Sequence, residues 1–356
     1  MVLLTMIHLV QGNIINADAE ALVNTVNTQG VMGKGIALQF KRAFPDNYKA
    51  YKKVCDRNEL QPGKLFVFDR HTFTNPRYII NFPTKVHWRS NSRYEYIESG
   101  LQALVKEIKE RAIQSIAIPP LGSGLGGLEW ERVRALIETA LTGLQNVAVH
   151  LYEPSGAPKP ESMVNCTHKP NMTHGRASLL LLMDSYAVPG YDYRLSLLEV
   201  QKLMYFMQQS GENLKLDFAK GAYGPYADNL RHVLNHIEGH FISGFGDGKN
   251  KPDVELHITD RKYINEASTF LNRYPETLAN LKRVQSLIQG FETPFGMELL
   301  SSVHWVCDRE KSVDKNDIDA VTKAVFDWNE RKRNFFKPEQ IRIAWEALIR
   351  EGWIEK

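Results

Sequence analysis

Short apolar runs alternate with amphipathic segments along residues 6–151. The runs predict strands at Met6–Val10, Ala21–Val26, Lys64–Phe68, Tyr78–Phe82, Ser115–Ile118 and Val147–Leu151. Between them, apolar positions recur at helical spacing and predict helices at Ile36–Phe44, Tyr94–Arg111 and Trp130–Leu144. Pro45 either ends the first of these helices or begins another. Such alternation is typical of an α/β/α domain, in which helices cover both faces of a sheet. We assign this domain to residues 1–155.

The hydrophobic pattern changes after this domain. Prolines, glycines and asparagines crowd the stretch from Glu153 to Thr173, which predicts an interdomain linker over residues 156–175. Residues 176–356 are expected to form a mainly α-helical second domain. The expected helices are His174–Tyr186, Leu195–Gln209, Tyr226–Phe241, Pro275–Gln289, Gly296–Cys307, Lys315–Arg331 and Lys337–Glu351, with Val254–Ile258 as a candidate short strand.

Composition narrows the class of protein. The chain has 356 residues, 43% hydrophobic and 24% charged, which suits two globular domains. A formal net charge of +3 neither requires nor excludes a polyanionic partner. The 3 cysteines are far apart and form no CxxC pair, so we expect neither a zinc site nor a disulfide framework. No stretch approaches the roughly 20 apolar residues of a membrane span. We therefore expect a soluble cytoplasmic protein without a membrane partner.

Two glycine-rich segments suggest a phosphate-binding site. Gly30–Gly35 and Gly122–Gly127 each follow a predicted strand and precede a predicted helix. Glycine permits positive φ and the close approach of a ligand, and N–H groups at a helix start favour phosphate. Each segment alone could be a simple tight turn. Two of them in one α/β domain suit a diphosphate held between two loops.

Other nucleotide-binding motifs fit poorly. A dinucleotide fingerprint G-x-G-x-x-G follows the first strand, with an acidic residue about 20 positions later. Here the first segment reads G-x-x-G-x-G and follows the second predicted strand. The sequence also contains no G-x-x-x-x-G-K-[ST] motif. A Rossmann dehydrogenase and a P-loop NTPase are therefore disfavoured.

Four elements together resemble the macrodomain family, which binds ADP-ribose. They are Gln11–Ile14, Ala21–Asn27, Gly30–Gly35 and Gly122–Gly127, in this order. The resemblance implies an α/β/α macrodomain whose mixed sheet is flanked by helices, with ADP-ribose as its ligand. It also implies a set of ligand-binding residues: Asn13, Ile14, Asn24, Asn27, Gly33, Gly35, Ile36, Ser123, Gly124, Leu125 and Gly126.

The resemblance gives several of these residues a role. Asn13 stands where the family usually has an aspartate that contacts adenine, and its amide oxygen could still accept a hydrogen bond from the adenine amine. Asn27 corresponds to the asparagine that faces the distal ribose. Gly33, Gly35 and the backbone of Ser123–Gly126 are expected to hold the diphosphate.

Lys85 is the candidate catalytic residue. The Thr84-Lys85 pair follows a predicted strand and resembles the macrodomain branch that cleaves ADP-ribosyl esters through a lysine, a branch that includes DNA ADP-ribosyl glycohydrolase antitoxins. Lysine could attack C1″ of the opened sugar or act electrostatically on the leaving group. From residue type alone, a solvated lysine is the commoner outcome. The ester-cleaving relatives carry an aspartate where this chain has Gly126, so the general acid or base stays unassigned.

The residues after Lys85 combine basic and aromatic side chains. Arg89 and Arg93 are interleaved with His87, Trp88 and Tyr94. This composition suits a single nucleic-acid strand, through phosphate contacts and base stacking. It equally suits a loop that leads into an amphipathic helix. His87 and, at a predicted helix start, Glu129 are interpreted as structural first.

Two segments of the second half resemble helical antitoxin domains of the Panacea or SocA-like type. They are Leu198–Met207 and Lys220–Tyr226. The resemblance implies binding and neutralisation of a partner toxin, a DNA ADP-ribosyltransferase. From the residues alone, the apolar face of the first segment favours a core. His232, His236 and His240 recur every four residues, but a packed or solvated stripe is favoured over a metal site. We expect no metal and no cofactor.

These features give one leading hypothesis and two alternatives. The leading one is an antitoxin whose macrodomain hydrolytically removes ADP-ribose from thymidine in single-stranded DNA, and whose second domain binds the toxin. One alternative is a reader that binds ADP-ribose without catalysis, for which Lys85 has no use. The other is a hydrolase of protein ADP-ribosyl esters or O-acetyl-ADP-ribose, for which the second domain has no evident use.

Overall fold

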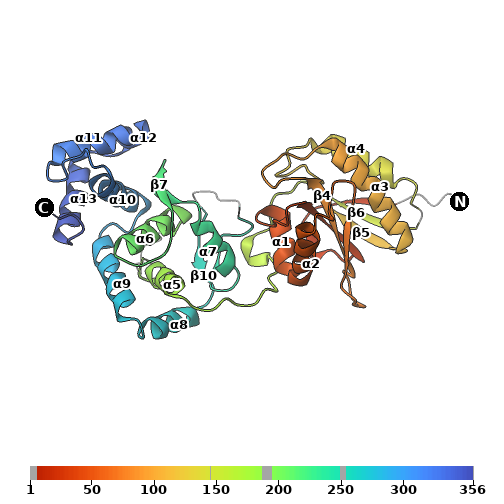
Figure 1. Ribbon diagram of the computed structural model, residues 1–356, viewed down its shortest axis with the longest axis horizontal. Helices are drawn as coiled ribbons and strands as arrows, with labels where there is room; N and C mark the ends of the chain where they lie inside the picture. The colour runs from red at the N-terminus through yellow and green to blue at the C-terminus, as the bar shows by residue number, and fades with distance from the viewer. Residues whose placement is uncertain (1–5, 145, 187–194, 249–253, 356) are drawn as a thin grey trace. The chain divides into compact units, whose positions relative to one another are not determined.

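The computed structural model describes residues 6–144, 146–186, 195–248 and 254–355 (Figure 1). The chain divides into two compact units. The first unit comprises Met1–His168 with Asp247–Lys249, and the second comprises Lys169–Gly246 with Asn250–Lys356. The chain passes from one unit to the other between His168 and Lys169, inside the segment that the sequence predicts as a linker.

A six-stranded mixed sheet forms the centre of the first unit. Its strands are β1 (Met6–Val10), β2 (Ala21–Asn27), β3 (Phe66–Asp69), β4 (Tyr78–Lys85), β5 (Ser115–Ile118) and β6 (Ala148–Tyr152). They lie in the order β1-β6-β5-β2-β4-β3, and every neighbouring pair is parallel except β3 with β4. Because β2 and β4 are parallel neighbours, the segments after their carboxyl ends leave the same edge of the sheet.

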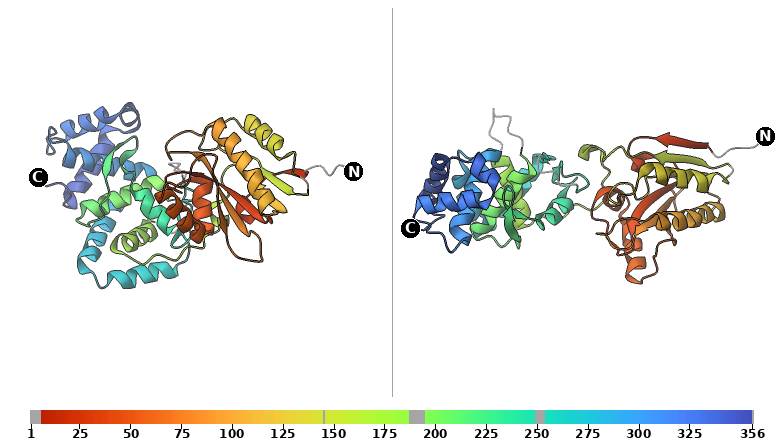
Figure 2. Two further views of the ribbon diagram at one scale, coloured as in Figure 1. Left: turned by 45° about the vertical axis from the view of Figure 1, so that its right-hand side comes forward. Right: turned by 90° about the horizontal axis from the view of Figure 1, so that it is seen from above.

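Helices cover both faces of this sheet, as predicted. They are α1 (Gly35–Ala43), α2 (Pro45–Asp56), α3 (Tyr94–Glu110) and α4 (Trp130–Leu141). Along β2, Ala21 and Val23 pack in the core that contains α3 and α4, whereas Leu22 packs with Phe40 of α1. This alternation reflects the two-residue period of a strand. The sheet lies between the two helix layers in Figure 1 and in the left view of Figure 2.

The sequence pattern leaves out some elements of the first unit. Helix α2 begins at Pro45, as one of the two interpretations of this proline allows, although its extent was not predicted; the missing N–H of proline costs nothing at a helix start. Two short 3-10 turns, η1 (Ile14–Asn16) and η2 (Pro160–Ser162), also lie outside the predicted elements. Helix α4 ends at Leu141, before the predicted Leu144.

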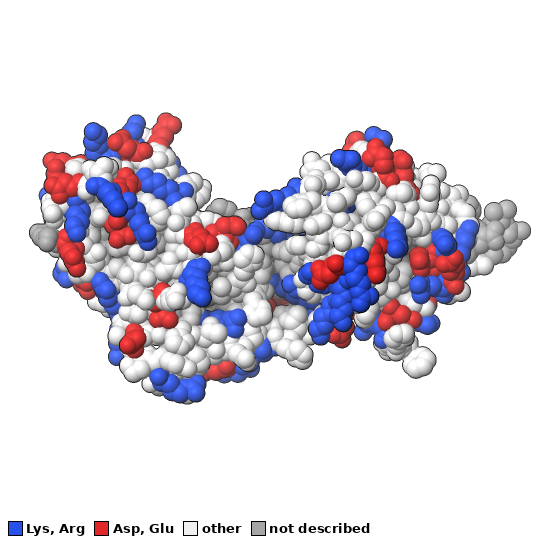
Figure 3. Space-filling view, viewed as in Figure 1, with Lys and Arg blue, Asp and Glu red and all other residues white. Residues whose placement is uncertain are grey.

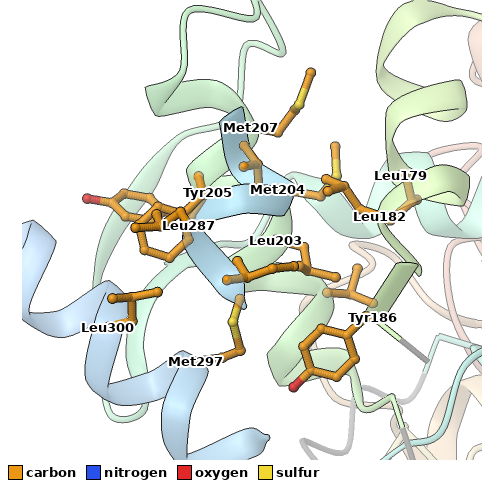
Figure 4. Close-up of a cluster of buried hydrophobic side chains, with 14 of the residues drawn as sticks. Leu179, Leu182, Tyr186, Leu203, Met204, Tyr205, Met207, Leu287, Met297 and Leu300 are labelled. Carbon is orange, nitrogen blue, oxygen red and sulfur yellow. The ribbon is translucent and has the colours of Figure 1, made fainter. Parts of the chain in front are cut away.

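The second unit is mainly helical, as predicted. Its helices are α5 (His174–Tyr186), α6 (Leu197–Gln209), α7 (Leu230–Ile237), α8 (Lys262–Leu271), α9 (Pro275–Ile288), α10 (Pro294–Arg309), α11 (Ile318–Trp328), α12 (Glu330–Phe335) and α13 (Pro338–Arg350). Two small antiparallel pairs accompany them: β7 (Phe218–Gly221) with β8 (Gly224–Ala227), and β9 (Ile242–Ser243) with β10 (His257–Ile258). Side chains from α5, α6, α9 and α10 gather in one core (Figure 4).

Three predicted elements of the second unit are wrong in extent. The predicted helix Tyr226–Phe241 is shorter, because Tyr226 belongs to the β7–β8 hairpin and α7 covers only Leu230–Ile237. The predicted helix Lys315–Arg331 is interrupted at Asn329, whose backbone is extended and whose side chain caps α12 by accepting a hydrogen bond from Lys332 N–H. The candidate strand Val254–Ile258 is reduced to His257–Ile258.

Candidate active site

The site begins where β2 and β4 end side by side. Asn27, the last residue of β2, pairs with Lys85, the last residue of β4, after a shift of register between Val26 and Asn27. Beyond this pair, the backbone N–H and the hydroxyl of Thr28 each donate to the carbonyl of Val86, both at 3.1 Å. These bonds hold the first glycine segment against the segment that follows Lys85.

The second glycine segment meets the same place. The Nζ of Lys85 donates to the carbonyl oxygen of Leu125 at 3.1 Å. A Cβ placed on Gly35, the first residue of α1, would lie 3.2 Å from Cδ1 of Leu125. The structure therefore brings Lys85 and both glycine segments together, although they are far apart in the sequence.

The environment of Lys85 raises the fraction of its amine that is neutral. The side chain is half-buried, and burial lowers the pKa of Lys85 below its ordinary value. Within the described part of the chain, no Asp or Glu forms an ion pair with this lysine. A lysine that is desolvated and lacks a carboxylate partner has a larger neutral fraction, which is the nucleophilic form.

Gly126 is enclosed by the loop that contains it. A Cβ at this position would lie under 3.0 Å from the carbonyl oxygen of Gly122 and from Oγ of Ser92. The carbonyl of Gly126 also accepts a hydrogen bond from Ser92 N–H at 2.9 Å. No side chain fits here without moving the backbone, so the missing aspartate has a steric cause. The other two positions of the predicted diphosphate cradle, Ser123 and Gly124, lie between these contacts, and Gly124 is open to solvent.

The first glycine segment is shaped by Asn27. Its amide Nδ2 donates to the carbonyl of Val31 at 2.6 Å, and its Oδ1 accepts from the N–H of Gln29 at 2.9 Å. The side chain is only 6% exposed, so most of its hydrogen-bonding capacity is used inside the loop. Gly33 is exposed, whereas Gly35 begins α1 with φ +60°, a conformation that favours glycine. Ile36 follows in the first turn of α1 and is half-buried.

The remaining predicted ligand residues lie deeper. Asn13 caps the turn η1, where its Oδ1 accepts from Ile15 N–H at 3.0 Å, and its buried Nδ2 finds no partner among the described residues. The oxygen expected to contact adenine thus already accepts one hydrogen bond and keeps a second lone pair. Ile14 is buried beside it. Asn24 is fully buried and donates to Oδ1 of Asn81 at 3.1 Å, and its amide also reaches Sδ of Met32, in the first glycine segment, at 3.9 Å.

Two further residues shape the site without having been predicted. The hydroxyl of Tyr51, on α2, donates to the carbonyl of Asn27 at 2.7 Å, and burial raises the pKa of Tyr51. Ser92 is buried against the second glycine segment. The hydroxyls of Ser92 and of the predicted Ser123 are buried and have no hydrogen-bond partner among the described residues. The helix that could begin at Pro45 had no predicted extent, so no sequence signal pointed to Tyr51.

Aromatic and basic side chains continue from Lys85. The rings of His87 and Trp88 stack with centroids 5.5 Å apart, and the guanidinium of Arg89 lies 4.5 Å from the centroid of the Trp88 ring. Nδ1 of His87 accepts from Arg89 N–H at 3.2 Å, which gives this histidine a structural role in the turn. Glu129 is the N-cap residue of α4, and its side chain makes no capping hydrogen bond.

The second unit brings its two singled-out segments together. Lys202 of α6 is 1% exposed, and its Nζ donates to the carbonyl of Pro225 in the β7–β8 hairpin at 2.7 Å. A cavity of about 200 Å³ beside them is lined by residues including Leu197, Lys202 and Tyr223.

The histidines of the second unit form no metal site among the described residues. His240 lies beyond the end of α7, and the described residues contain no cluster of three His, Cys, Asp or Glu that could hold a metal ion. None of the described helices is long and apolar enough to cross a membrane.

Comparison with known proteins identifies the family. A model described as Macro domain matches residues 23–137. The DNA ADP-ribosyl glycohydrolase of Thermus aquaticus is 48% identical over 347 residues, covering 98% of this chain and 94% of that protein. A DNA ADP-ribosyl transferase-DNA ADP-ribosyl glycohydrolase fusion protein of Thermosipho africanus is 37% identical over 163 residues, 42% of each protein. The solved macrodomain of Thermus aquaticus DarG is 59% identical, covers 42% of this chain and 99% of that chain, and gives a TM-score of 0.41. Identity of 48% along nearly the whole chain shows that it belongs to the DNA ADP-ribosyl glycohydrolase (DarG) family of hydrolases.

Proposed function

We propose that the first unit hydrolytically removes ADP-ribose from thymidine in single-stranded DNA, with Lys85 as the catalytic residue. Membership of the glycohydrolase family supports the reaction. The observation that carries the residue assignment is the position of Lys85 at the junction of both glycine segments, 3.1 Å from the Leu125 carbonyl. Two phosphate-binding loops would hold the diphosphate there and bring the distal ribose near Asn27 and Lys85.

The proposed chemistry needs no carboxylate at Gly126. Thymine leaves through a ring nitrogen as a moderately stable imide anion, so the lysine can assist bond cleavage without a strong acid. In one route the neutral amine attacks C1″, a C–N bond to Lys85 forms, and the bond to thymine breaks with its electron pair on the base. The alkylated amine then gives up a proton and the thymine imide takes one up. Water adds to C1″, the C–N bond to Lys85 breaks with its electron pair on nitrogen, and the proton of the water returns to the lysine, so that free ADP-ribose and the amine result. In the other route the ammonium stabilises the departing imide.

Two substitutions of Lys85 test the assignment and separate these routes. Lys85→Ala should abolish release of ADP-ribose from a modified single-stranded oligonucleotide and leave binding of free ADP-ribose within about threefold, because backbone groups hold the diphosphate. Lys85→Arg keeps the charge but is not a nucleophile at neutral pH. Residual turnover in Lys85→Arg supports the electrostatic route, and its loss supports attack. Wild-type turnover in Lys85→Ala would refute the assignment.

We further propose that the second unit binds and neutralises a DNA ADP-ribosyltransferase toxin, which makes the chain an antitoxin. The fusion of a transferase to a related glycohydrolase in Thermosipho africanus supports a functional link between the two activities. The resemblance of Leu198–Met207 and Lys220–Tyr226 to antitoxin domains supports the location, because Lys202 and Pro225 join these segments at the core of the unit.

The full-length Lys85→Ala protein tests this antitoxin role. It should still bind the cognate transferase and suppress its modification of single-stranded DNA, because inhibition by binding does not need hydrolysis. The measurement is transferase activity against antitoxin concentration, with purified full-length chains. If Lys85→Ala neither binds nor inhibits the transferase, the chain protects DNA by hydrolysis alone and the proposed role of the second unit is wrong.

Two other functions remain distinguishable by substrate. A non-catalytic reader would bind ADP-ribose and release it from no substrate. A hydrolase of protein ADP-ribosyl esters or O-acetyl-ADP-ribose would act on those compounds and not on modified DNA. We also propose a cytoplasmic location, which the free thiols of Cys55, Cys166 and Cys307 support.

A further inference from the structure

Exposed hydrophobic side chains concentrate around Lys85. The first unit has seven large hydrophobic side chains that are exposed among its described residues, and four of them belong to the three segments that meet at this lysine. They are Val31 (37% exposed), Val86 (43%), Trp88 (40%) and Leu125 (59%). We call these four residues the apolar collar. A cluster of exposed apolar side chains next to a polar site marks a binding surface.

Contacts between the segments keep the collar together. Asn27 holds Val31 through hydrogen bonds to both its N–H and its carbonyl. Thr28 joins the same loop to the carbonyl of Val86. Lys85 holds Leu125 through its carbonyl. These bonds hold together, at Lys85, the three segments that carry the collar residues.

Charge complements this apolar surface. The three segments Gly30–Ile36, Lys85–Arg93 and Pro119–Leu128 contain four basic residues and no Asp or Glu. The basic residues are Lys34, Lys85, Arg89 and Arg93. Aromatic and apolar surface among cations, without acidic side chains, fits a chain of bases and phosphates. A site for a protein substrate has no comparable reason to lack Asp and Glu.

ADP-ribose alone leaves Val86 and Trp88 of the collar unexplained. The backbone of the glycine segments suffices for the diphosphate, and Asn13 and Ile14 lie on another loop, after β1. Val86 and Trp88 follow directly after Lys85, the proposed catalytic residue, so we place them on the side where the group attached to C1″ leaves. This placement rests on the proposed function of the first unit.

We propose that the apolar collar is a nucleotide subsite, which holds the modified thymine and a neighbouring base of a single DNA strand. Trp88 supplies the stacking surface. A base that stacks on Trp88 takes the place of the Arg89 guanidinium over the ring and releases that cation to the adjoining phosphate. A duplex offers no free base face to this surface, so the subsite selects single strands.

Binding measured without turnover tests the subsite. In the Lys85→Ala background, Trp88→Ala should weaken binding of an ADP-ribosylated single-stranded oligonucleotide about tenfold, the usual effect of losing one base stack. Trp88→Phe should restore most of the affinity, because stacking needs an aromatic face. Binding of free ADP-ribose should not change in either variant. Equal loss for the oligonucleotide and for free ADP-ribose would mean that Trp88 only supports the loop, and would overturn the proposal.

Phe73 provides the matched control. It is the most exposed large hydrophobic residue of the first unit, and it lies between β3 and β4, before the amino end of β4 and therefore at the opposite edge from Lys85. Phe73→Ala should bind the oligonucleotide like its parent. If Phe73→Ala weakens binding as much as Trp88→Ala does, the effect is a general loss of hydrophobic surface and the subsite is wrong.

A salt titration and a second substrate complete the test. Arg89→Gln should lower the slope of log affinity against log salt by about one, as expected for one phosphate contact. An unchanged slope would remove Arg89 from the subsite. If the wild-type protein releases ADP-ribose from modified DNA but Trp88→Ala does not change binding of the oligonucleotide, the subsite is refuted and the proposed function stands. Absence of turnover on DNA, with release from modified protein, refutes the proposed function itself.

Discussion

At the scale of single residues, Gly126 shows how backbone packing can decide chemistry. Its Cβ position is filled by the Gly122 carbonyl and by Ser92, so this loop cannot carry the aspartate of the ester-cleaving macrodomains. The carbonyl of Leu125, one residue earlier, is instead the partner of Lys85. In the proposed mechanism the loop therefore contributes backbone atoms, and the proposed catalytic side chain comes from β4.

Gly126→Ala should weaken ADP-ribose binding and lower the rate of release at least about tenfold. The added Cβ forces the loop away from Gly122 and Ser92, and buried overpacking costs about 1–3 kcal/mol. The matched control is Gly143→Ala, an exposed position after α4 and outside the site, since a Cβ there also meets nothing within 4 Å. Calorimetric titration with ADP-ribose measures both variants. If Gly126→Ala binds ADP-ribose as well as Gly143→Ala does, the second glycine segment tolerates the added Cβ and the prediction is wrong.

At the scale of elements, features set by residues close together in the sequence were predictable, and strand pairings set by distant residues were not. Glycine segments after Asn27 and after Ile118 were predictable, because each strand–loop–helix pattern lies within a short stretch. The pairing of Asn27 with Lys85 was not, because β2 and β4 are neighbours only through the topology of the sheet. Helix α8 was not predicted, and the β7–β8 hairpin was assigned partly to a helix, since Gly224-Pro225 signals a turn but not the strands around it.

The position of helix α2 leads to a prediction about Tyr51. Tyr51→Phe removes the 2.7 Å hydrogen bond to the Asn27 carbonyl and leaves that buried oxygen without its donor, at a cost of about 1–3 kcal/mol. The first glycine segment should loosen, so ADP-ribose binding should fall several-fold and the first unit should melt earlier. Tyr48→Phe, on the same helix, is the control, because among the described contacts the Tyr48 hydroxyl donates to nothing. Equal behaviour of the two variants would contradict a bracing role for α2.

At the scale of the whole molecule, the two units use charge differently. In the first, basic side chains gather around Lys85 without acidic neighbours in the three site segments. In the second, basic and acidic side chains are interspersed over the face seen in Figure 3, with no continuous acidic surface on that face. The second unit instead buries charge: Lys332 is fully buried and donates to Glu298 at 2.9 Å, and Lys202 lies inside the same unit.

Buried Lys202 should make the stability of the second unit depend on pH. Burial, with the nearby charge of Lys332, lowers the pKa of Lys202 from 10.5 to about 7. Between these values the unfolded chain binds one more proton than the folded chain, so stability rises as pH rises from about 7 towards 10, and is flat below 7. Relative to Lys202→Met, the wild-type free energy of unfolding should therefore increase by roughly 3–5 kcal/mol across this range. Urea unfolding followed by helical circular dichroism measures it, with exposed Lys282→Met as the control. A wild-type minus Lys202→Met difference that stays constant with pH would mean that the ammonium remains charged in the folded unit, held by Pro225 and by the field of Glu298.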